Sequence, residues 1–352
     1  MTQVAFGVFD WVDRNAGPLH QLYEERLRVA EAADSAGLFC YHVAEHHATP
    51  LGMAPSPALF LTALAQRTRR IHLGPLGALL PLYDPLRLIE EVCMLDQLSG
   101  GRLELGISRG VSPYELACFG VDAAGTRPIF DEAVAVLVAG LTRERLNFEG
   151  KHYRYDNVPI ELQPFQRPYP PFWYPTRNPE SVLYAARHGY NVVSGGPAAV
   201  VRPYVESYWR TWEAHRNDPG RLSGHVAEPK FGALRQVIVA DTDEAALEAA
   251  RDAHTTWYRS ITKLWHAYGD HQPDTIFNWD FCVEHETLMF GSPARVREQF
   301  ARFFERSGCN YVACAFSFGT LPHAEALRSL RLFADEVMPA FAAAAAPATT
   351  HP

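Results

Sequence analysis

The sequence lacks several features that mark whole classes of proteins. Among its 352 residues no run approaches about 18 uncharged apolar residues, so we expect no segment that crosses a membrane. No block of Lys and Arg occurs and the formal net charge is −8, which argues against a nucleic-acid partner. The opening residues MTQVAFGVFD carry no basic stretch of the kind that begins a signal peptide. Together these absences favour a cytoplasmic protein.

Cysteine and glycine patterns exclude two further classes. The six cysteines form no C-x-x-C pair and no metal-ligand spacing, so we expect reduced, mostly packed thiols. No Walker motif occurs, and no glycine-rich phosphate loop follows the first predicted strand. An open, doubly wound sheet usually carries such a loop, and this alternative fold is therefore disfavoured.

What the sequence does contain is a regular alternation of strand-like and helix-like segments. Hydrophobic residues make up 47% of the chain, enough for a sizeable core. The short apolar runs that predict strands lie at 4–9, 38–43, 71–80, 102–108, 171–175, 190–194, 233–240 and 311–316. Helical periodicity fills the intervals between them. Eight strands separated by helices predict an α/β fold, a single closed (β/α)₈ TIM barrel.

Two insertions and a tail interrupt this pattern. The polar and aromatic stretch 146–170 predicts a hairpin insertion, and 243–259 predicts a helix followed by an irregular segment. That segment, 260–290, combines Gly and Pro with Trp and Phe, which suits a lid that excludes water; an insertion packed permanently on the barrel is the alternative. We expect one domain over 1–340 and a disordered tail over 341–352.

A cluster of ionisable residues follows the second predicted strand. Residues 41–47 read Y-H-V-A-E-H-H, and in a (β/α)₈ barrel the active site lies at the carboxyl ends of the strands. Adjacent residues of an extended chain point to opposite sides, so His46 and His47 cannot easily bind one ion together. His42 could share a face with His46 but lies deeper in the strand. A catalytic site and a satisfied structural cluster both remain open, and we expect no metal site.

Two further strand ends offer groups that bind anions. The fourth strand ends G-I-S-R-G, which places Arg109 at the mouth, either as a phosphate ligand or in a surface ion pair. The fifth strand runs into T-R-N-P-E-S, so Arg177, Asn178 and Ser181 would lie at a helix N-terminus, where anions bind readily. The third strand ends in the apolar, glycine-rich G-P-L-G-A-L-L-P, which suits a flat ring. One apolar wall and one phosphate anchor predict a mononucleotide cofactor.

At this point the sequence resembles a known family along nearly its whole length, the bacterial luciferase-like flavin-dependent monooxygenases. The matching pieces are A-E-H-H at 44–47, L-D-Q-L-S-G-G-R-L-E-L-G-I-S-R-G at 95–110, F-G-V-D at 119–122 followed by Arg127, A-A-R-H-G at 185–189, G-S-P at 291–293 and L-F-A-D-E-V-M-P at 332–339. The match over 95–110 is long and specific. The family fold is the same (β/α)₈ barrel.

The resemblance implies an enzyme that uses reduced FMN and O₂. In the family a flavin peroxide oxidises a small organic substrate, such as an aldehyde or ketone, and a separate reductase supplies the reduced FMN. Two alternatives remain: a hydride-transfer oxidoreductase that uses FMN or a deazaflavin, and a non-catalytic flavin-binding protein. The A-E-H-H motif resembles the FMN branch more closely. The expected partners are therefore the substrate, O₂ and a flavin reductase.

Residue roles carry over position by position. By resemblance His46 assists proton transfer beside the flavin, and Glu45 and His47 orient it. The residues expected to bind the cofactor are Leu76, Gly77, Ser108, Arg109, Arg177, Asn178 and Ser181. Leu76–Gly77 matches a non-prolyl cis peptide under the flavin ring, and Arg109, Asn178 and Ser181 match phosphate ligands. Arg177 replaces an acidic residue of luciferase and Ser108 a reactive cysteine, which weakens any inference of light emission.

The resemblance also implies a homodimer. Luciferase relatives pair through helices beside strands two to four, and here that region includes the predicted helix 85–98. This helix carries apolar residues on more than one side, namely Leu86, Ile89, Val92, Cys93 and Leu95. A helix that is apolar all round is usually buried by more than its own barrel, so we expect a second copy of the chain to cover it.

Overall fold

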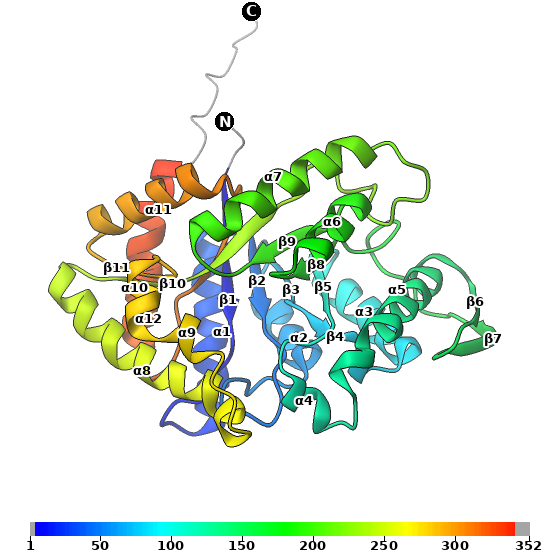
Figure 1. The fold of residues 1–352 in the computed structure, drawn as a ribbon, viewed down its shortest axis with the longest axis horizontal. Helices are drawn as coiled ribbons and strands as arrows, with labels where there is room; N and C mark the ends of the chain where they lie inside the picture. Colours follow the sequence, from blue (N-terminus) through cyan, green and yellow to red (C-terminus); the bar gives the residue numbers. More distant parts are fainter. Residues whose placement is uncertain (1–3, 342–352) are drawn as a thin grey trace, which may run out of the picture.

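Residues 4–341 are described by the computed structural model, and their strands form a nearly closed, mostly parallel barrel with helices outside (Figure 1). The strands are β1 Ala5–Asp10, β2 Cys40–Val43, β3 His72–Pro75, β4 Ala78–Leu79, β5 Leu105–Ser108, β8 Phe172–Pro175, β9 Asn191–Ser194, β10 Phe231–Val239 and β12 Tyr311–Ala315. Their order is β3-β2-β1-β12-β10-β9-β8-β5-β4. A parallel bridge between Leu73 of β3 and Leu103, just before β5, brings the two ends of this order together. The predicted (β/α)₈ barrel is confirmed.

Helices fill the intervals between the strands. They are α1 Leu19–Ala36, α2 Pro57–Arg67, α3 Pro85–Ser99, α4 Pro113–Ala117, α5 Thr126–Thr142, α6 Pro179–His188, α7 Ala198–His215, α8 Asp243–Ala267, α9 Asp274–Phe277, α10 Trp279–Glu284, α11 Pro293–Ser307 and α12 His323–Leu332. Short helical turns follow at Leu80–Leu82, Ala123–Gly125, Phe333–Val337 and Met338–Phe341. In α3, for example, the Asp84 side chain accepts from two backbone N–H groups at the start, and Gly100 ends the helix with φ 68°.

The interior of the barrel is filled with aromatic side chains near the amino ends of the strands. Tyr311 and Trp173 are fully buried, with ring centroids 5.1 Å apart, and His42 packs against both rings. Gly7 permits this packing, since a Cβ there would lie 1.9 Å from the Tyr311 hydroxyl oxygen. The amino end is therefore closed, which leaves the opposite end of the barrel for a cavity.

Two strand predictions need correction, and the predicted hairpin is present. The expected strand 71–80 is two strands, β3 and β4, separated by a cis peptide between Leu76 and Gly77. An additional strand, β11 Leu288–Gly291, pairs with β10 and was missed, because four residues after an irregular stretch give little periodicity. The hairpin is present as the antiparallel strands β6 Arg145–Glu149 and β7 Arg154–Pro159.

The predicted lid segment is more ordered than a loop. The helix expected at 243–259 continues to Ala267 as α8, and α9 and α10 follow before β11. In Figure 1 the end of α8, α9 and α4 lie at the end of the barrel away from the chain's N-terminus, where the strands point. We call 265–285 the mouth segment. The predicted tail, apart from Phe341, lies outside the described residues.

The apolar residues of α3 do not by themselves indicate a homodimer. Helix α3 packs between α2 and α5, and Ile89, Val92, Cys93 and Leu95 are buried within the chain itself. Their apolar character is therefore explained without a second copy. The exposed apolar residues of α3 are instead Met94 (53%) and Leu98 (47%). The dimer itself stays a prediction.

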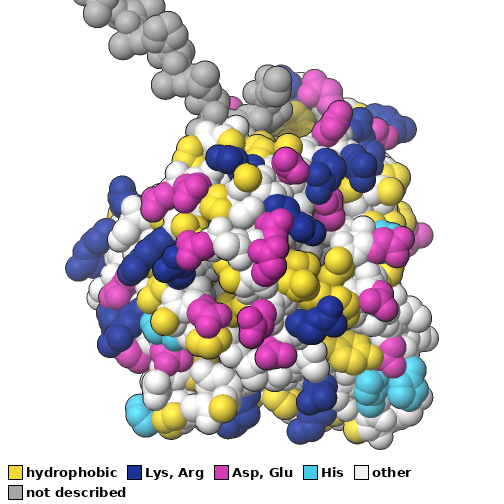
Figure 2. All heavy atoms as spheres, turned by 90° about the vertical axis from the view of Figure 1, so that its left-hand side faces the viewer, with side chains coloured by type: hydrophobic (Ala, Val, Ile, Leu, Met, Phe, Trp, Pro, Cys, Tyr) yellow, Lys and Arg dark blue, Asp and Glu magenta, His cyan; other side chains and the backbone are white. Residues whose placement is uncertain are grey.

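The outer face formed over α8 and α11 carries charges of both signs. Figure 2 shows Lys and Arg intermixed with Asp and Glu on this face. Several of the charges are paired: Arg295 Nη1 lies 3.2 Å from an Asp243 carboxylate oxygen, and Arg302 contacts Glu286. Among the described residues, no helix combines the length and hydrophobicity that crossing a membrane requires.

Candidate functional site

A cavity of about 420 Å³ opens at the carboxyl ends of the barrel strands. Its walls come from nearly every strand end and from the mouth segment. The lining residues include Ala44, Glu45, His46, Leu76, Gly77, Ser108, Arg109, Glu115, Arg177, Gly195, Gly196, Trp257, Ile276 and Phe277. The fold thus gathers most of the predicted site residues, which lie between positions 45 and 177 of the sequence, into one cavity, as (β/α)₈ barrels do.

His46 is held on the cavity wall by Glu115. The His46 Nδ1 atom lies 3.1 and 3.2 Å from the two carboxylate oxygens of Glu115, and the backbone N–H of His47 donates to Glu115 at 2.8 Å. Glu115 is buried and belongs to the short helix α4, where Ser112 is the N-cap residue. A carboxylate acceptor fixes the proton on Nδ1 and leaves Nε2 as the basic atom.

Glu45 and His47 do not orient His46, contrary to the prediction. One Glu45 oxygen pairs with His47 Nε2 at 3.0 Å, and the other accepts from the Leu79 N–H at 3.1 Å and the Tyr83 hydroxyl at 2.9 Å. Glu45 therefore ties the end of β2 to the region of β4. Glu45 lines the cavity, whereas His47 lies behind the wall against Phe119.

The partner that sequence reasoning missed, Glu115, did leave a signal. Ser112 and Glu115 form the S-x-x-E pattern of a capping box directly after the R-G pair at 109–110. The pattern places the Glu115 carboxylate in the first turn of a helix that begins soon after Arg109. It does not reveal that the partner of this carboxylate is His46, which lies 69 positions earlier in the chain.

One wall of the cavity is apolar and made largely of backbone. Leu76 and Gly77 line it, and the cis peptide expected between them is present. Gly106 of β5 allows the close approach of this wall, since a Cβ there would lie 2.0 Å from the Pro75 carbonyl oxygen. The resulting surface suits a flat ring.

Two arginines, Arg109 and Arg177, also line the cavity. Among residues 4–341, the side chains of Arg109 and Arg177 make no ion pair and no hydrogen bond, although the Arg177 carbonyl accepts from Tyr204. Ser108 holds the turn that carries Arg109, because its hydroxyl accepts from the Gly110 N–H at 3.0 Å. Two guanidinium groups without carboxylate partners are available to an anion in the cavity, and their role as phosphate ligands stays a prediction.

Asn178 and Ser181 lie beside this anion site rather than in the cavity wall. The Asn178 side-chain oxygen accepts from the Ser181 N–H at 3.0 Å and caps α6. Ser181 is buried, and neither residue lines the cavity. Their predicted role as phosphate ligands is not supported by the outline of the cavity, and it stays a prediction.

The mouth segment covers the cavity and is clasped to α4. Tyr114 stacks on Tyr268 with centroids 4.4 Å apart and donates to Asp270 at 3.0 Å. Burial and then this hydrogen bond raise the pKa of Tyr114 above its ordinary value. Ile276 and Phe277 of α9 turn apolar surface to the cavity. The mouth segment thus contributes apolar side chains to that side of the cavity.

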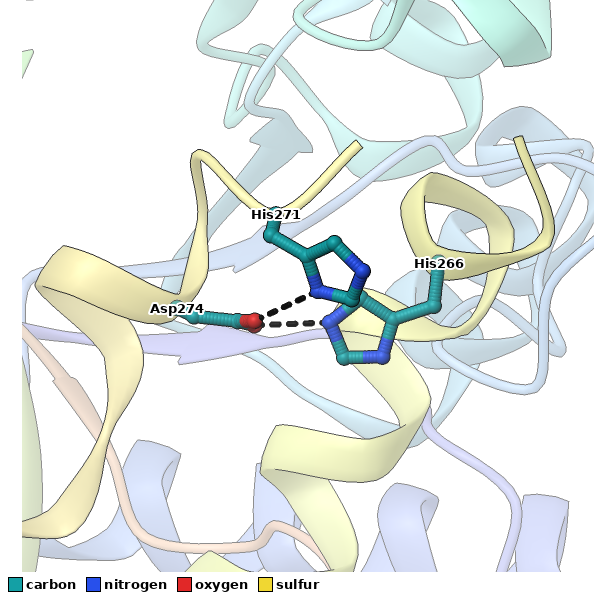
Figure 3. A group of neighbouring side chains, drawn as sticks. All are labelled: His266, His271 and Asp274. Carbon is teal, nitrogen blue, oxygen red and sulfur yellow. Dashed lines mark hydrogen bonds and ion pairs between the residues drawn. The ribbon is translucent and has the colours of Figure 1, made fainter. Parts of the chain in front are cut away.

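A second group of ionisable residues lies outside the cavity. His266, His271 and Asp274 of the mouth segment converge, as Figure 3 shows. The carboxylate lies 2.7 Å from His266 Nε2 and 2.9 Å from His271 Nδ1. This group was not predicted from the sequence, because the three residues do not follow a known ligand spacing.

Known proteins share both the sequence and this architecture. The family model described as luciferase-like monooxygenase matches residues 4–311. The uncharacterized protein y4wF of Sinorhizobium fredii is 39% identical over 339 residues, which cover 96% of this chain and 97% of that protein. The oxygenase component of the flavin-dependent trigonelline monooxygenase of Acinetobacter baylyi is 30% identical over 252 residues, covering 69% and 68% of the two chains.

A solved structure shows the same fold. It is the oxygenating constituent of 3,6-diketocamphane monooxygenase from Pseudomonas putida in complex with FMN, with a TM-score of 0.80, 22% identity, and coverage of 96% of this chain and 98% of that one. The family model spans most of the chain, and the two relatives match over most of their own length. The chain belongs to the luciferase-like monooxygenase family.

Proposed function

We propose that this protein is the oxygenase of a two-component system, which uses reduced FMN and O₂ to oxidise a small organic molecule. The observation that carries the proposal is the convergence of three elements in one cavity. These are the apolar wall at Leu76–Gly77, the unpaired arginines Arg109 and Arg177, and the His46–Glu115 pair. A phosphorylated, flat cofactor and an acid–base group are what such a cavity accommodates.

The residues present fit FMN. Arg109 and Arg177 would hold the phosphate, since guanidinium groups bind phosphate through paired hydrogen bonds. Leu76 and Gly77 would support the ring. Once bound and reduced, FMN supplies the two electrons with which one oxygen atom of O₂ enters the substrate while the other leaves as water. The named relatives that use flavin or FMN support this choice of cofactor.

His46 would move the proton that this chemistry requires. Its Nδ1–H is fixed on Glu115, so Nε2 can accept or donate a proton on the cavity side. Glu115 would hold the ring in one orientation and stabilise the imidazolium form. This division of work resembles that of a carboxylate behind a general-base histidine.

The mouth segment would keep water from the reacting groups. Phe277, Ile276 and Trp257 present apolar surface to the cavity, and the Tyr114 clasp holds the segment against α4. Exclusion of water limits the loss of reducing equivalents to hydrogen peroxide. The same apolar surface favours an uncharged or largely apolar substrate, such as an aldehyde or ketone.

A separate reductase would supply the reduced FMN. The cavity has one anion site, and the sequence has no second nucleotide-binding motif through which NAD(P)H could bind. The Acinetobacter relative is the oxygenase component of its monooxygenase, which supports this division. The homodimer remains part of the proposal and rests on the family resemblance alone.

The proposal is tested by supplying photoreduced FMN without any reductase. The protein, reduced FMN and air are incubated with decanal, cyclohexanone or trigonelline, and products are examined by mass spectrometry. We expect a product heavier by one oxygen atom from at least one of these compounds, with none when FMN is withheld. Conversion with a reduced deazaflavin in the absence of O₂ would instead support the hydride-transfer alternative.

A further inference from the structure

The mouth segment gathers two imidazoles and a carboxylate at one point outside the cavity. His266 lies in the last turn of α8, His271 in the loop that follows, and Asp274 at the first residue of α9 (Figure 3). The potential ligand atoms of all three lie within 4.8 Å of one another. None of the three lines the cavity, so the group does not belong to the site described above.

We propose that His266, His271 and Asp274 form a zinc-binding site. Three ligands of a tetrahedral zinc ion, each about 2.0–2.2 Å from the metal, lie roughly 3.3–3.6 Å from each other. The two nitrogen-to-carboxylate distances are 2.7 and 2.9 Å, so each pair needs to open by less than about 1 Å. Rotation of the His266 and His271 side chains, which are 35% and 66% exposed, would supply that movement.

The donor set selects the metal. Two imidazole nitrogens and one carboxylate oxygen suit zinc and its neighbours among the transition metals, whereas magnesium and calcium prefer oxygen ligands alone. His271 is 66% exposed, and His266 and Asp274 are each about one-third exposed, so an ion can reach the site from solvent. Water would complete the fourth position.

Neighbouring groups already hold the carboxylate in place. The Tyr258 hydroxyl donates to Asp274 Oδ1 at 2.7 Å, and the Asn278 side-chain N–H donates to the Asp274 carbonyl at 2.7 Å. Hydrogen bonds of this kind orient metal ligands and reduce the entropy lost on binding. The arrangement of Asp274 therefore does not depend on the ion.

The position of the site gives zinc a structural effect. Zinc would join the end of α8 to the start of α9, and Ile276 and Phe277 of α9 form part of the cavity wall. Binding would stabilise the mouth segment in its place over the cavity. Because no ligand touches the cavity, zinc would act on stability and not on the chemical step.

Isothermal titration tests the proposal. Tag-free full-length protein, stripped with EDTA and dialysed, is titrated with zinc chloride, with magnesium chloride as a second titrant. We expect one zinc per chain, with a micromolar dissociation constant, and no magnesium binding. His271→Ala and Asp274→Asn should each weaken zinc binding by more than about tenfold. A matched control is His215→Ala, because His215 pairs with Asp218 but has no second imidazole beside it.

Thermal unfolding gives an independent readout. Zinc should raise the unfolding midpoint of the wild-type protein and of His215→Ala, but not of the two site variants. Circular dichroism establishes that the variants are folded. The proposal is overturned by the absence of binding at millimolar zinc, or by equal affinity in the wild type and both site variants, which would place the zinc elsewhere. In either case the hydrogen bonds to Asp274 alone account for the cluster.

Discussion

His46 Nδ1 lies 3.1 and 3.2 Å from the carboxylate oxygens of Glu115, a residue 69 positions further along the chain. The contact joins the end of β2 to the short helix α4, and α4 is also the element that Tyr114 clasps to the mouth segment. Closure of the cavity and orientation of the histidine thus depend on the same five-residue helix. The first two predictions test the two members of this pair.

Replacing His46 by Ala should impair oxygenation far more than cofactor binding. A general acid–base group typically contributes a factor of about 10²–10⁴, and His46→Ala should lower the rate of product formation by that range. FMN affinity, measured by fluorescence titration, should change little. Added EDTA should leave the wild-type rate unchanged, since no metal takes part in the step. Normal turnover by His46→Ala would show that the histidine has another role.

Replacing Glu115 by Gln should reproduce part of this loss by releasing the histidine. The amide can no longer stabilise the imidazolium, so we expect a loss of roughly 10- to 1000-fold in product formation and a displaced pH–rate profile. Glu45→Gln is the matched comparison. Glu45 bonds to the Leu79 N–H and the Tyr83 hydroxyl, so its loss should lower the unfolding midpoint more than the activity of the folded fraction. A larger loss of activity in Glu45→Gln than in Glu115→Gln would contradict the structure.

Replacing Arg109 by Ala should weaken binding of FMN but not of riboflavin. A charge-assisted hydrogen bond contributes about 1.5–3 kcal/mol, so FMN affinity should fall roughly ten- to a hundred-fold, with riboflavin nearly unaffected. Asn178→Ala is the control, because loss of a helix cap costs about 1 kcal/mol of stability without removing a charge from the anion site. Equal losses for the two ligands would show that Arg109 does not contact the phosphate.

Acid should destabilise the protein through His254. This side chain is 1% exposed, and burial lowers its pKa from 6.5 to about 4. Because the folded pKa is the lower one, its contribution is fully present above pH 6.5 and is lost as the pH falls toward 4. Between pH 7 and pH 5 the loss amounts to about 2 kcal/mol. Urea unfolding at both pH values measures it.

The matched variant for this experiment is His254→Phe, which keeps a ring against Trp257 and Trp279. Between pH 7 and pH 5 the wild type should lose about 2 kcal/mol more free energy of unfolding than this variant does. His215→Phe, at an exposed position, should behave like the wild type. An unchanged pH dependence in His254→Phe would mean that other groups account for the acid sensitivity.

The barrel could be predicted from sequence because most of its strands and helices have a clear local sequence pattern. Apolar runs of four to six residues and capping residues such as Asp84 and Gly100 mark most boundaries. The missed strand β11 is short, and the last turns of α8 carry polar residues that hide their periodicity. These failures concern segments whose conformation is set by tertiary contacts rather than by local pattern.

The site was predictable only to the extent that barrel geometry makes it so. The rule that functional groups lie at strand ends brought His46, Arg109 and Arg177 together correctly. It could not choose between Glu45 and Glu115 as the partner of His46, since that depends on where α4 folds back across the mouth. For the same reason it did not reveal that the Asn178 side-chain oxygen caps α6, and the role of Asn178 as a phosphate ligand stays a prediction.

The most direct test of the proposed oxygenase uses ¹⁸O₂. Wild-type protein and anaerobically prepared reduced FMN are mixed with a converted substrate and ¹⁸O₂ in ordinary water. We expect one ¹⁸O atom in each product molecule, with the yield reduced in His46→Ala and at low FMN in Arg109→Ala. A product that carries oxygen from water, or that forms equally without O₂, would contradict an oxygenase that uses FMN and O₂.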